Sequence, residues 1–563
     1  MYMEKYQSWL DAPYIDDQTK EELKTIKGDE KEIEDRFYQN LSFGTAGLRG
    51  IIGAGTNRMN RYTVMEATKG LALTILEEGE KGKMKGVVIG YDVRHMSKEF
   101  AQIAAEVFAA YGVKVYLFDQ IAATPLLSYA VLTLETQAGV MITASHNPKE
   151  YNGYKAYWEE GSQILDNIGD RIVKNIESIE NYGAIESMPL EEAKEKGLVT
   201  MVGADLIDRY VGEIVSRKIT DQLDTSVRIV YTPLNGTGNQ FVRRVLEERG
   251  FTNVHIVEEQ EMPDPDFATV GYPNPEDPKA FALAEKLGKE VDADLLIATD
   301  PDSDRIAMEV KGENGDYVFF NGNRIGSLLV HHILSNLKNE GKLPEDAVMA
   351  KSIVTGDLST KIAKDFGVTM KEQLTGFKNL YAIANQMEEE GTIDKFLFAY
   401  EESIGYSYGT YVRDKDAVMS AMLIAEMAGV AKMNGTTIIE QLEELFKKYG
   451  YHKEKLISVV REGSDGQEVI KKTMEAFRAE PIETLGDEKL EKVEDFTKED
   501  YGIGRSNVLK YYYDGGSWYA VRPSGTEPKI KFYMYSVAVT AEEANNTLRE
   551  MEDEIMKKAD AVL

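Results

Sequence analysis

The chain has 563 residues, a length that allows roughly three to five domains. Hydrophobic residues make up 43% and charged residues 29%, which is typical of a globular protein. Asp and Glu total 96 against 65 for Lys and Arg, and the resulting net charge of −31 argues against a general nucleic-acid binder and against docking on anionic lipid. A small anionic ligand would need basic side chains concentrated in one cleft.

Cysteine and long apolar segments are both missing from the sequence. The absence of cysteine removes disulfides, cysteine nucleophiles and cysteine-ligated metal sites together. No apolar run reaches the ~18 residues of a membrane-spanning helix, and the first residues are charged too early for a signal peptide. We therefore expect a cytoplasmic protein without a membrane partner.

Along the chain, the segment 1–40 is polar and predicts amphipathic helix. Short apolar runs then alternate with helical stretches, which is typical of parallel α/β units. A further round of the same pattern occupies 323–376. The predicted strands before it are 87–93, 113–119, 138–144, 227–233 and 292–300.

From about residue 455 onward the strand-like runs stand next to one another and the helices stand apart, which predicts a smaller α+β domain. The charged run 488–500 is expected to be a solvated loop or helix face. The predicted fold class is α/β, with three mixed α/β domains and a C-terminal α+β domain. The predicted domains are 1–200, 201–315, 316–455 and 456–563.

The motif TASHNP follows an apolar strand, and its Asn-Pro pair forbids simple helix continuation. The hydroxyl of Ser145 is therefore expected on an exposed loop at the carboxyl end of the strand, where open α/β sheets place ligands. His146 is adjacent, and Lys155 follows in the same stretch. A serine can carry a covalent group if its surroundings activate it, although a polar turn would explain this loop equally well.

The motif DPDSDR also directly follows an apolar strand and places Asp300, Asp302 and Asp304 at alternate positions. Three such carboxylates can converge on one hard cation, Mg²⁺ or Ca²⁺. An EF-hand does not fit, because Arg305 and Lys311 stand where that loop needs Gly and Glu. The open coordination positions favour Mg²⁺ that also contacts a phosphate; an acidic helix N-terminus is the alternative.

Two further motifs carry groups suited to a sugar phosphate. In EESIG, Glu401 and Ser403 can hydrogen-bond vicinal sugar hydroxyls, although a solvated acidic turn would look the same. In RPSGTEPK, an arginine fork, two hydroxyls and a glycine suit a phosphate dianion, although a hairpin-like turn also explains Pro and Gly. The candidate residues of this last motif are Arg522, Ser524, Gly525 and Thr526.

These four motifs occur in the order and approximate spacing of the α-D-phosphohexomutase family, which the chain resembles along nearly its whole length. The stretch FGTAGLRG near the start is also similar to the family's N-terminal signature. The resemblance implies four domains around a central cleft, each contributing one loop. It also implies a small sugar phosphate as substrate. We expect a monomer or homodimer, and the net charge argues against nucleic-acid and membrane partners.

The resemblance further implies a role for each candidate. Ser145 matches the phosphoserine, whose phosphate joins three aspartates in binding one Mg²⁺ per chain. Arg49 and Arg305 match active-site arginines, Lys155 and His146 match residues proposed for proton transfer, and Lys378 resembles a substrate-binding lysine. The matching metal ligands are Asp300, Asp302 and Asp304. The matching sugar and phosphate contacts are Glu401, Ser403, Arg522, Ser524, Gly525 and Thr526.

The implied reaction transfers a phosphoryl group from Ser145 to a sugar monophosphate and recovers one from the resulting glucose 1,6-bisphosphate. Lys155 is the preferred general base, because desolvation and a nearby cation should lower its pKa. The Glu-Glu-Ser pattern resembles glucose-preferring members. Tyr400 stands where many relatives have Gly, which keeps mannose and pentose phosphates open as substrates.

Three other interpretations compete with this one. Asp300 could be the nucleophile of a Mg²⁺-dependent, haloacid-dehalogenase-like phosphohydrolase, which would leave the Ser145 loop unexplained. Ser145 and His146 could form a serine acyl hydrolase, but adjacent Ser and His rarely give nucleophile–base geometry and no GxSxG elbow is present. A non-catalytic sugar-phosphate-binding protein would not need an intact serine and metal loop.

Overall fold

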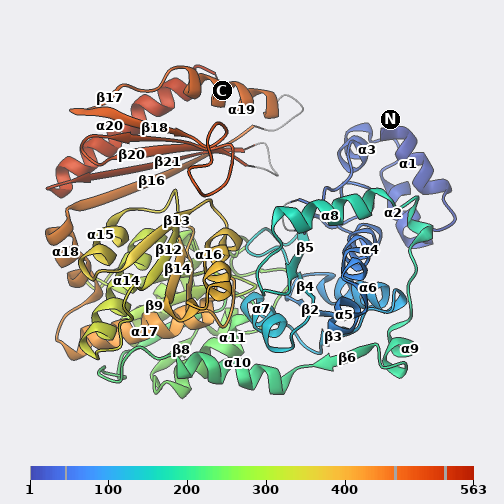
Figure 1. The fold of residues 1–563 in the computed structure, drawn as a ribbon, viewed down its shortest axis with the longest axis horizontal. Coiled ribbons are helices and arrows are strands. Elements are labelled where there is room, and N and C mark those ends of the chain that lie inside the picture. The colour runs from blue at the N-terminus through green and yellow to red at the C-terminus, as the bar shows by residue number, and fades with distance from the viewer. Residues whose placement is uncertain (1, 45–46, 462–465, 525–528, 563) are drawn as a thin grey trace.

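The computed structural model describes residues 2–44, 47–461, 466–524 and 529–562. These residues form four blocks, each built around its own sheet (Figure 1). In that view the first block lies on the right, the second and third lie together at the lower left, and the fourth stands above the third. None of the helices in the described part of the chain is long and apolar enough to cross a membrane.

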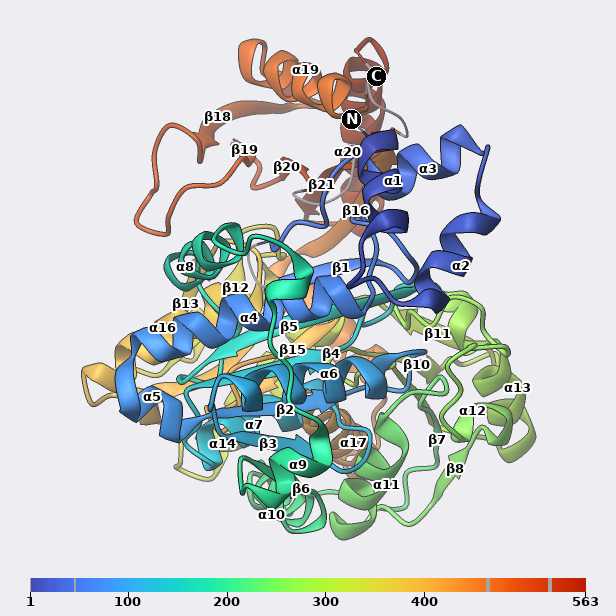
Figure 2. The same ribbon diagram turned by 90° about the vertical axis from the view of Figure 1, so that its right-hand side faces the viewer.

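The first block combines a helical segment with a six-stranded sheet in the order β1-β5-β4-β2-β3-β6. Strands β2 and β4 are buried along their whole length, because helices cover the sheet; α4 and α6 cover the face toward the viewer in Figure 2. The elements are α1 (Tyr2–Asp11), α2 (Asp17–Thr25), α3 (Glu30–Phe37), β1 (Gly47–Ile51), α4 (Arg61–Glu77), α5 (Gly79–Lys85), β2 (Val87–Tyr91), α6 (Ser97–Ala110), β3 (Val115–Phe118), α7 (Thr124–Thr133), β4 (Ala138–Ile142), β5 (Tyr151–Trp158), α8 (Asp166–Glu177), α9 (Leu190–Glu195) and β6 (Val199–Val202).

The second block has a five-stranded sheet in the order β11-β10-β9-β7-β8. Its β9 is a continuous apolar run, buried throughout, and ends directly before Asp300. The elements are α10 (Ala204–Ser216), β7 (Ile229–Thr232), α11 (Gly238–Glu248), β8 (Val254–Ile256), α12 (Glu258–Glu261), α13 (Ala282–Val291), β9 (Leu295–Thr299), β10 (Ile306–Lys311) and β11 (Tyr317–Phe320).

The third block has a four-stranded sheet in the order β13-β12-β14-β15. Its α17 is apolar on nearly every side and is packed against both the second and third blocks, so these two blocks share a core. The elements are α14 (Gly322–Asn339), β12 (Val348–Ser352), α15 (Leu358–Asp365), β13 (Thr369–Gln373), α16 (Phe377–Glu389), β14 (Phe396–Glu401), β15 (Gly405–Tyr408), α17 (Ala417–Met433) and α18 (Ile438–Tyr449).

The fourth block has an antiparallel sheet in the order β16-β21-β20-β19-β18-β17. Helices α19 and α20 pack on a core of its own, and its other face meets the third block where Trp518 and Tyr535 contact Ile353 and Val354. The elements are β16 (Tyr451–Val460), α19 (Gly466–Ala479), β17 (Thr484–Leu485), β18 (Glu488–Asp495), β19 (Leu509–Tyr513), β20 (Trp518–Pro523), β21 (Lys529–Ala538) and α20 (Ala541–Asp560).

The predicted fold class is confirmed, with three α/β blocks and a C-terminal block on an antiparallel sheet. The interpretation of 488–500 as a loop or helix face is wrong for its first half, since β18 pairs with β19 and Leu490 packs toward the core. We keep the four domain ranges as a proposal. The limit near 315 falls before β11, which belongs to the second sheet, and the limit near 455 falls inside β16.

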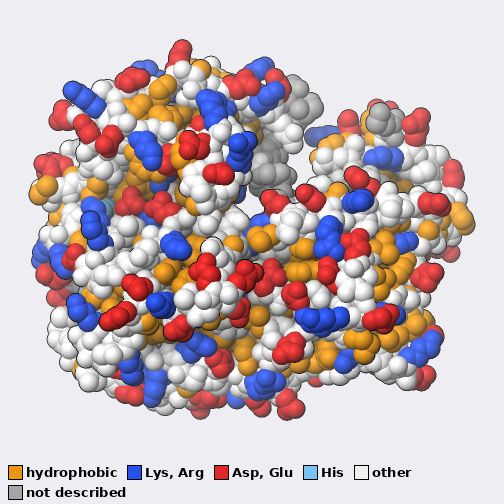
Figure 3. All heavy atoms as spheres, viewed as in Figure 1, with side chains coloured by type: hydrophobic (Ala, Val, Ile, Leu, Met, Phe, Trp, Pro, Cys, Tyr) orange, Lys and Arg blue, Asp and Glu red, His pale blue; other side chains and the backbone are white. Residues whose placement is uncertain are grey.

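The surface of the protein carries both signs of charge. On the face shown in Figure 3, acidic and basic side chains are interspersed over all the blocks. The same view shows an opening between the fourth block and the first. Acidic side chains on this face therefore stand among basic ones.

Candidate active site

Two loops that follow buried strands face each other across the boundary between the first and second blocks. Ser145 lies after β4 and is buried, so the expectation of an exposed loop is wrong at this residue, and Asp300 begins the loop after β9. The Ser145 hydroxyl donates to Oδ2 of Asp300 at 2.9 Å. The carboxyl ends of the two strands therefore converge, at the place where open α/β sheets bind ligands.

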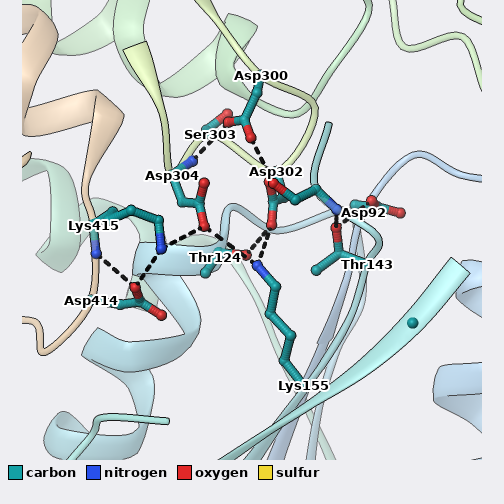
Figure 4. A network of polar contacts seen from close by, with 12 residues as sticks. Asp92, Thr124, Thr143, Lys155, Asp300, Asp302, Ser303, Asp304, Asp414 and Lys415 are labelled. Carbon is teal, nitrogen blue, oxygen red and sulfur yellow. Dashed lines mark hydrogen bonds and ion pairs between the residues drawn. The ribbon is translucent and has the colours of Figure 1, made fainter. Parts of the chain in front are cut away.

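The three aspartates of the second loop form a compact cluster (Figure 4). Asp300, Asp302 and Asp304 are buried, and one carboxylate oxygen from each lies within 4.8 Å of the others. Within the described residues, Oδ1 of Asp302 and Oδ1 of Asp304 are buried without a hydrogen-bond donor. Such oxygens are costly to bury, and a hard divalent cation would satisfy them. The donor set therefore fits Mg²⁺.

The three carboxylates experience different electrostatic surroundings. Burial, together with the charges of the two neighbouring aspartates, raises the pKa of Asp300 well above its ordinary value. Burial also acts to raise the pKa of Asp304, but Lys415, Lys155 and Arg305 outweigh it and lower that pKa. A bound divalent cation would favour the ionised form of all three carboxylates.

The Ser145 loop is held by Arg94, which the sequence analysis did not single out. Ser145 has a φ of 53°, so the chain turns through the left-handed region. The buried Arg94 guanidinium donates to the carbonyl oxygens of Ser145 at 2.6 Å and Asn147 at 2.5 Å, and pairs with Asp92 at 3.3 Å. The ring of Phe267, from the second block, lies 5.1 Å from the same guanidinium. Arg94 thus fixes the direction of the loop.

Two lysines from different blocks reach the aspartate cluster. Nζ of Lys155, on β5, lies 2.8 Å from Asp302 and 3.4 Å from Asp304, and Nζ of Lys415, from the third block, lies 3.1 Å from Asp304. Burial acts to lower the pKa of Lys155, but the two carboxylates outweigh it and raise that pKa. The expected lowering is therefore not what this arrangement gives, because ion pairing prevails over desolvation.

His146 and two arginines gather beside Ser145. Nδ1 of His146 lies 3.2 Å from Oγ of Ser145, so the two adjacent side chains do meet, because the left-handed turn brings them to one side. Burial lowers the pKa of His146 well below its ordinary value, and nearby Arg305 and Arg49 lower it further. Nη1 of Arg49 donates to Asn147 at 3.2 Å. In the described chain no carboxylate bonds to His146, so the third member of an acyl-hydrolase triad is missing.

The EESIG loop is fixed from two sides. Oε1 of the buried Glu401 accepts a hydrogen bond from the backbone N–H of Gly376 at 2.6 Å. The N–H of Ile306, in the second block, donates to the carbonyl oxygen of Ile404 at 3.1 Å. Ser403 lies between these two anchors and is partly exposed. The loop therefore presents Ser403 next to the start of β10, which directly follows the aspartate motif.

The fourth-block motif is described only in part. Arg522 lies near the end of β20 and is partly exposed. The N–H of Ser524 donates to the carbonyl oxygen of Lys529 at 2.7 Å, which brings the two ends of the loop together. The predicted residues Gly525 and Thr526 lie outside the described residues.

Comparisons with known proteins agree with this arrangement. Models of the phosphoglucomutase/phosphomannomutase family match alpha/beta/alpha domain I at 40–183, domain II at 208–313, domain III at 321–449 and the C-terminal domain at 458–554. The chain belongs to the phosphoglucomutase/phosphomannomutase family. Each matched stretch contains one of the four predicted loops.

Individual relatives extend over most of the chain. The phosphoglucomutase of Staphylococcus haemolyticus is 38% identical over 512 residues, covering 89% of this chain and 91% of the relative. The phosphoglucomutase of Staphylococcus aureus (strain USA300) is 36% identical over 518 residues, with 90% and 91% coverage. The open form of the phosphoglucomutase pp63/parafusin from Paramecium shares the fold, with a TM-score of 0.70 and 17% identity over 93% of this chain and 95% of that one.

Within this family fold, the predicted Lys378 and a second lysine of the third block occupy different places. Nζ of Lys378 bonds to Asp166 at 3.0 Å and to the carbonyl oxygen of Ile164 at 3.3 Å, both in the first block. Lys415 is the third-block lysine at the aspartate cluster, and sequence reasoning missed it. The sequence feature that could have pointed to Lys415 is its position between two aspartates, in the run RDKD shortly after β15.

We predict that Mg²⁺ stabilises the protein through the aspartate cluster. In the parent, MgCl₂ should raise the apparent melting temperature, because ligand binding favours the folded state. Asp302→Asn should lose most of that increase, since it removes a buried charged ligand. Asp316→Asn, at an exposed carboxylate paired with Lys289, is the matched control and should keep the increase. An increase in Asp302→Asn equal to that of the parent would contradict this assignment.

Proposed function

We propose that this chain is a phosphoglucomutase, which interconverts glucose 1-phosphate and glucose 6-phosphate through phosphorylated Ser145 and glucose 1,6-bisphosphate. The observation that carries the proposal is the hydrogen bond of 2.9 Å from the Ser145 hydroxyl to Asp300. It sets a potential phosphoryl carrier against a carboxylate cluster suited to Mg²⁺. The names of the two staphylococcal relatives support the same activity.

The proposed reaction consists of two transfers that mirror each other. The bond between phosphorus and Oγ of Ser145 breaks while a bond forms between phosphorus and a hydroxyl oxygen of the sugar monophosphate, whose proton passes to a base. The other phosphate of the bisphosphate then returns to Oγ. Bound Mg²⁺, held by the three aspartates and a phosphate oxygen on Ser145, would neutralise charge on the transferring group. The protein mainly has to position the reactants.

The side chains around Ser145 can be assigned to charge balance and proton transfer. Arg49 and Arg305 lie near His146 and can hold the negative charge of a phosphoryl group. We assign proton transfer to Lys155 and His146. Nδ1 of His146 lies 3.2 Å from Oγ of Ser145, and Nζ of Lys155 lies 2.8 Å from Asp302. Although burial acts to lower the pKa of Lys155, the charge of Asp302 raises it and favours the protonated form. Lys415 balances the charge of Asp304 from the opposite side.

We further assign the sugar hydroxyls to Glu401 and Ser403, with glucose preferred over mannose and pentoses. Tyr400, which stands where many relatives have Gly, is fully buried. Its hydroxyl donates to Ser359 at 2.7 Å, and its ring fills the space beside Gly326. The departure at Tyr400 is therefore accommodated in the core of the third block, which supports keeping the sugar assignment.

The remaining assignments concern the far end of the substrate and the setting of the enzyme. We assign the non-transferred phosphate to the fourth-block loop, with Lys378 as an additional contact if its pair with Asp166 opens. We also propose that the protein acts in the cytoplasm as a monomer or homodimer. The phosphate-binding residues proposed in that loop are Arg522, Ser524, Gly525 and Thr526.

The competing phosphohydrolase needs Asp300 as the nucleophile. Oδ1 of Asp300 accepts the backbone N–H groups of Asp304 at 3.1 Å and Arg305 at 3.0 Å, and Oδ2 accepts the Ser145 hydroxyl. Both oxygens are therefore engaged, one of them by Ser145. An acid-stable phosphoserine supports the mutase, whereas an acid-labile acyl phosphate supports the phosphohydrolase.

We predict that Ser145→Ala abolishes phosphoenzyme formation and lowers kcat by on the order of 10³-fold or more, because the phosphoryl carrier is lost. Binding of glucose 6-phosphate, measured by calorimetry, should persist. Ser178→Ala, at an exposed helix end, is the matched control and should keep parental turnover. Turnover of Ser145→Ala within twofold of the parent would refute the phosphoserine mechanism.

We predict that glucose 1-phosphate is the preferred substrate among the 1-phosphates of glucose, mannose, glucosamine and ribose. The reason is the pair Glu401 and Ser403, fixed by Gly376 and by the second block. Coupled assays with the corresponding bisphosphate present give kcat/KM for each sugar. A higher kcat/KM for mannose or ribose 1-phosphate would assign the chain to another activity of the same family.

A further inference from the structure

The helices before residue 40 lie outside the stretch matched by the family model for domain I. They form a small module, α1–α3, with its own aromatic core. The Trp9 ring contacts Phe37 within the module at 5.6 Å, and contacts Tyr62 of α4 and Tyr182 at 5.4 and 5.6 Å. The module is therefore packed firmly against the first block, and none of the functions assigned above uses it.

The module is hydrogen-bonded to the turn that follows β1. Glu22 and Arg36 form an ion pair of 2.5 Å. Glu22 accepts the N–H of Ala54 at 2.9 Å, and Arg36 donates to the carbonyl oxygen of the same residue at 3.1 Å. The N–H of Asn57 donates to the carbonyl oxygen of Arg36 at 2.9 Å. One ion pair thus holds both polar backbone groups of Ala54.

Two further features show that this contact is close and specific. Gly55 has a φ of 135°, and a Cβ there would lie 2.7 Å from the carbonyl oxygen of Arg36, so only glycine allows this approach. The largely buried Arg58 donates to Asp35 of the module at 2.5 Å. The turn 52–59 is therefore shaped by the module and not by the sheet alone.

The turn directly follows the strand that carries Arg49. β1 stands at the edge of the first sheet, and among the described strands it pairs with β5. Its end is closed by the N–H of Met59, which donates to the carbonyl oxygen of Ile51 at 2.8 Å. Edge strands with one partner open more easily than central ones. A turn clamped by the module would oppose that opening.

We propose that α1–α3 brace β1, and that Arg36 and Glu22 are positioning residues that act on the proposed mutase reaction through Arg49. The inference rests on the proposed function for its link to catalysis. Arg49 extends from β1 to Asn147 in the Ser145 loop at 3.2 Å, and Gly47 pairs with Lys155 across the same two strands. A loosened turn would shift Arg49 relative to the phosphoryl group, and small misplacements are costly in catalysis.

The test combines Arg36→Met, which keeps the aliphatic stem and removes the fork, with Arg49→Ala in a double-mutant cycle. In the parent background, Arg36→Met should lower kcat/KM about tenfold, mainly through kcat. In the Arg49→Ala background, the same change should cost less than about twofold. Lys24→Met, at an exposed lysine of α2 paired with Glu21, is the matched control and should be neutral in both backgrounds.

Hydrogen exchange gives a second readout that needs no activity. Amides of β1 and of the turn 52–59 should exchange at least tenfold faster in Arg36→Met, and those of β2 should be unchanged. If Arg36→Met shows this exchange pattern but the parent has no mutase activity, the proposed function fails and the brace stands. Unchanged exchange in β1, or an equal loss of kcat/KM in both backgrounds, overturns the brace. If Arg36→Met does not fold, Glu22→Gln replaces it in the double-mutant cycle and in the hydrogen-exchange measurement. The same results are expected of it, and the same results would overturn the brace.

Discussion

The mutual repulsion of three buried carboxylates is the constraint around which the cleft is assembled. Asp300, Asp302 and Asp304 lie within 4.8 Å of one another in the absence of bulk water. Burying even one unpaired charge is costly, and three like charges multiply that cost. The protein offsets it with Lys155 from the first block and Lys415 from the third. The charge balance of the cluster therefore draws on three blocks.

The segment that carries Lys415 also joins the first and third blocks. The Asp414 carboxylate accepts the hydroxyl of Tyr157 at 2.6 Å, and the N–H of Arg413 donates to Ser128 at 2.8 Å. Asp416, which directly follows Lys415, caps α17 by accepting hydrogen bonds from the N–H groups of Val418 and Met419 at the start of that helix. A single short run thus sets the distance between blocks and the position of one charge at the cluster. The fourth block instead meets the third through an aromatic face, and the opening in Figure 3 separates it from the first.

Sequence reasoning located the strands and the loops at their ends, because apolar runs and strand-to-loop transitions are local signals. Ser145 and the aspartates follow such runs, and the structure brings them together. Lys415 was missed because its place depends on a contact between distant blocks. The strand 488–495 was missed because backbone pairing, and not hydrophobic alternation, determines it. The charge state of Lys155 likewise depends on carboxylates from another block, which no local pattern reveals.

In the proposed reaction, the aspartate cluster holds a divalent cation directly against a phosphoryl group on Ser145. Mn²⁺ accepts the same oxygen ligands as Mg²⁺ and is paramagnetic, so electron–nuclear double resonance can detect a phosphorus nucleus bound through one oxygen. We expect a strong ³¹P coupling in the phosphorylated, Mn²⁺-loaded protein that disappears on dephosphorylation. Bound Mn²⁺ with no ³¹P coupling in the phosphorylated protein would contradict it.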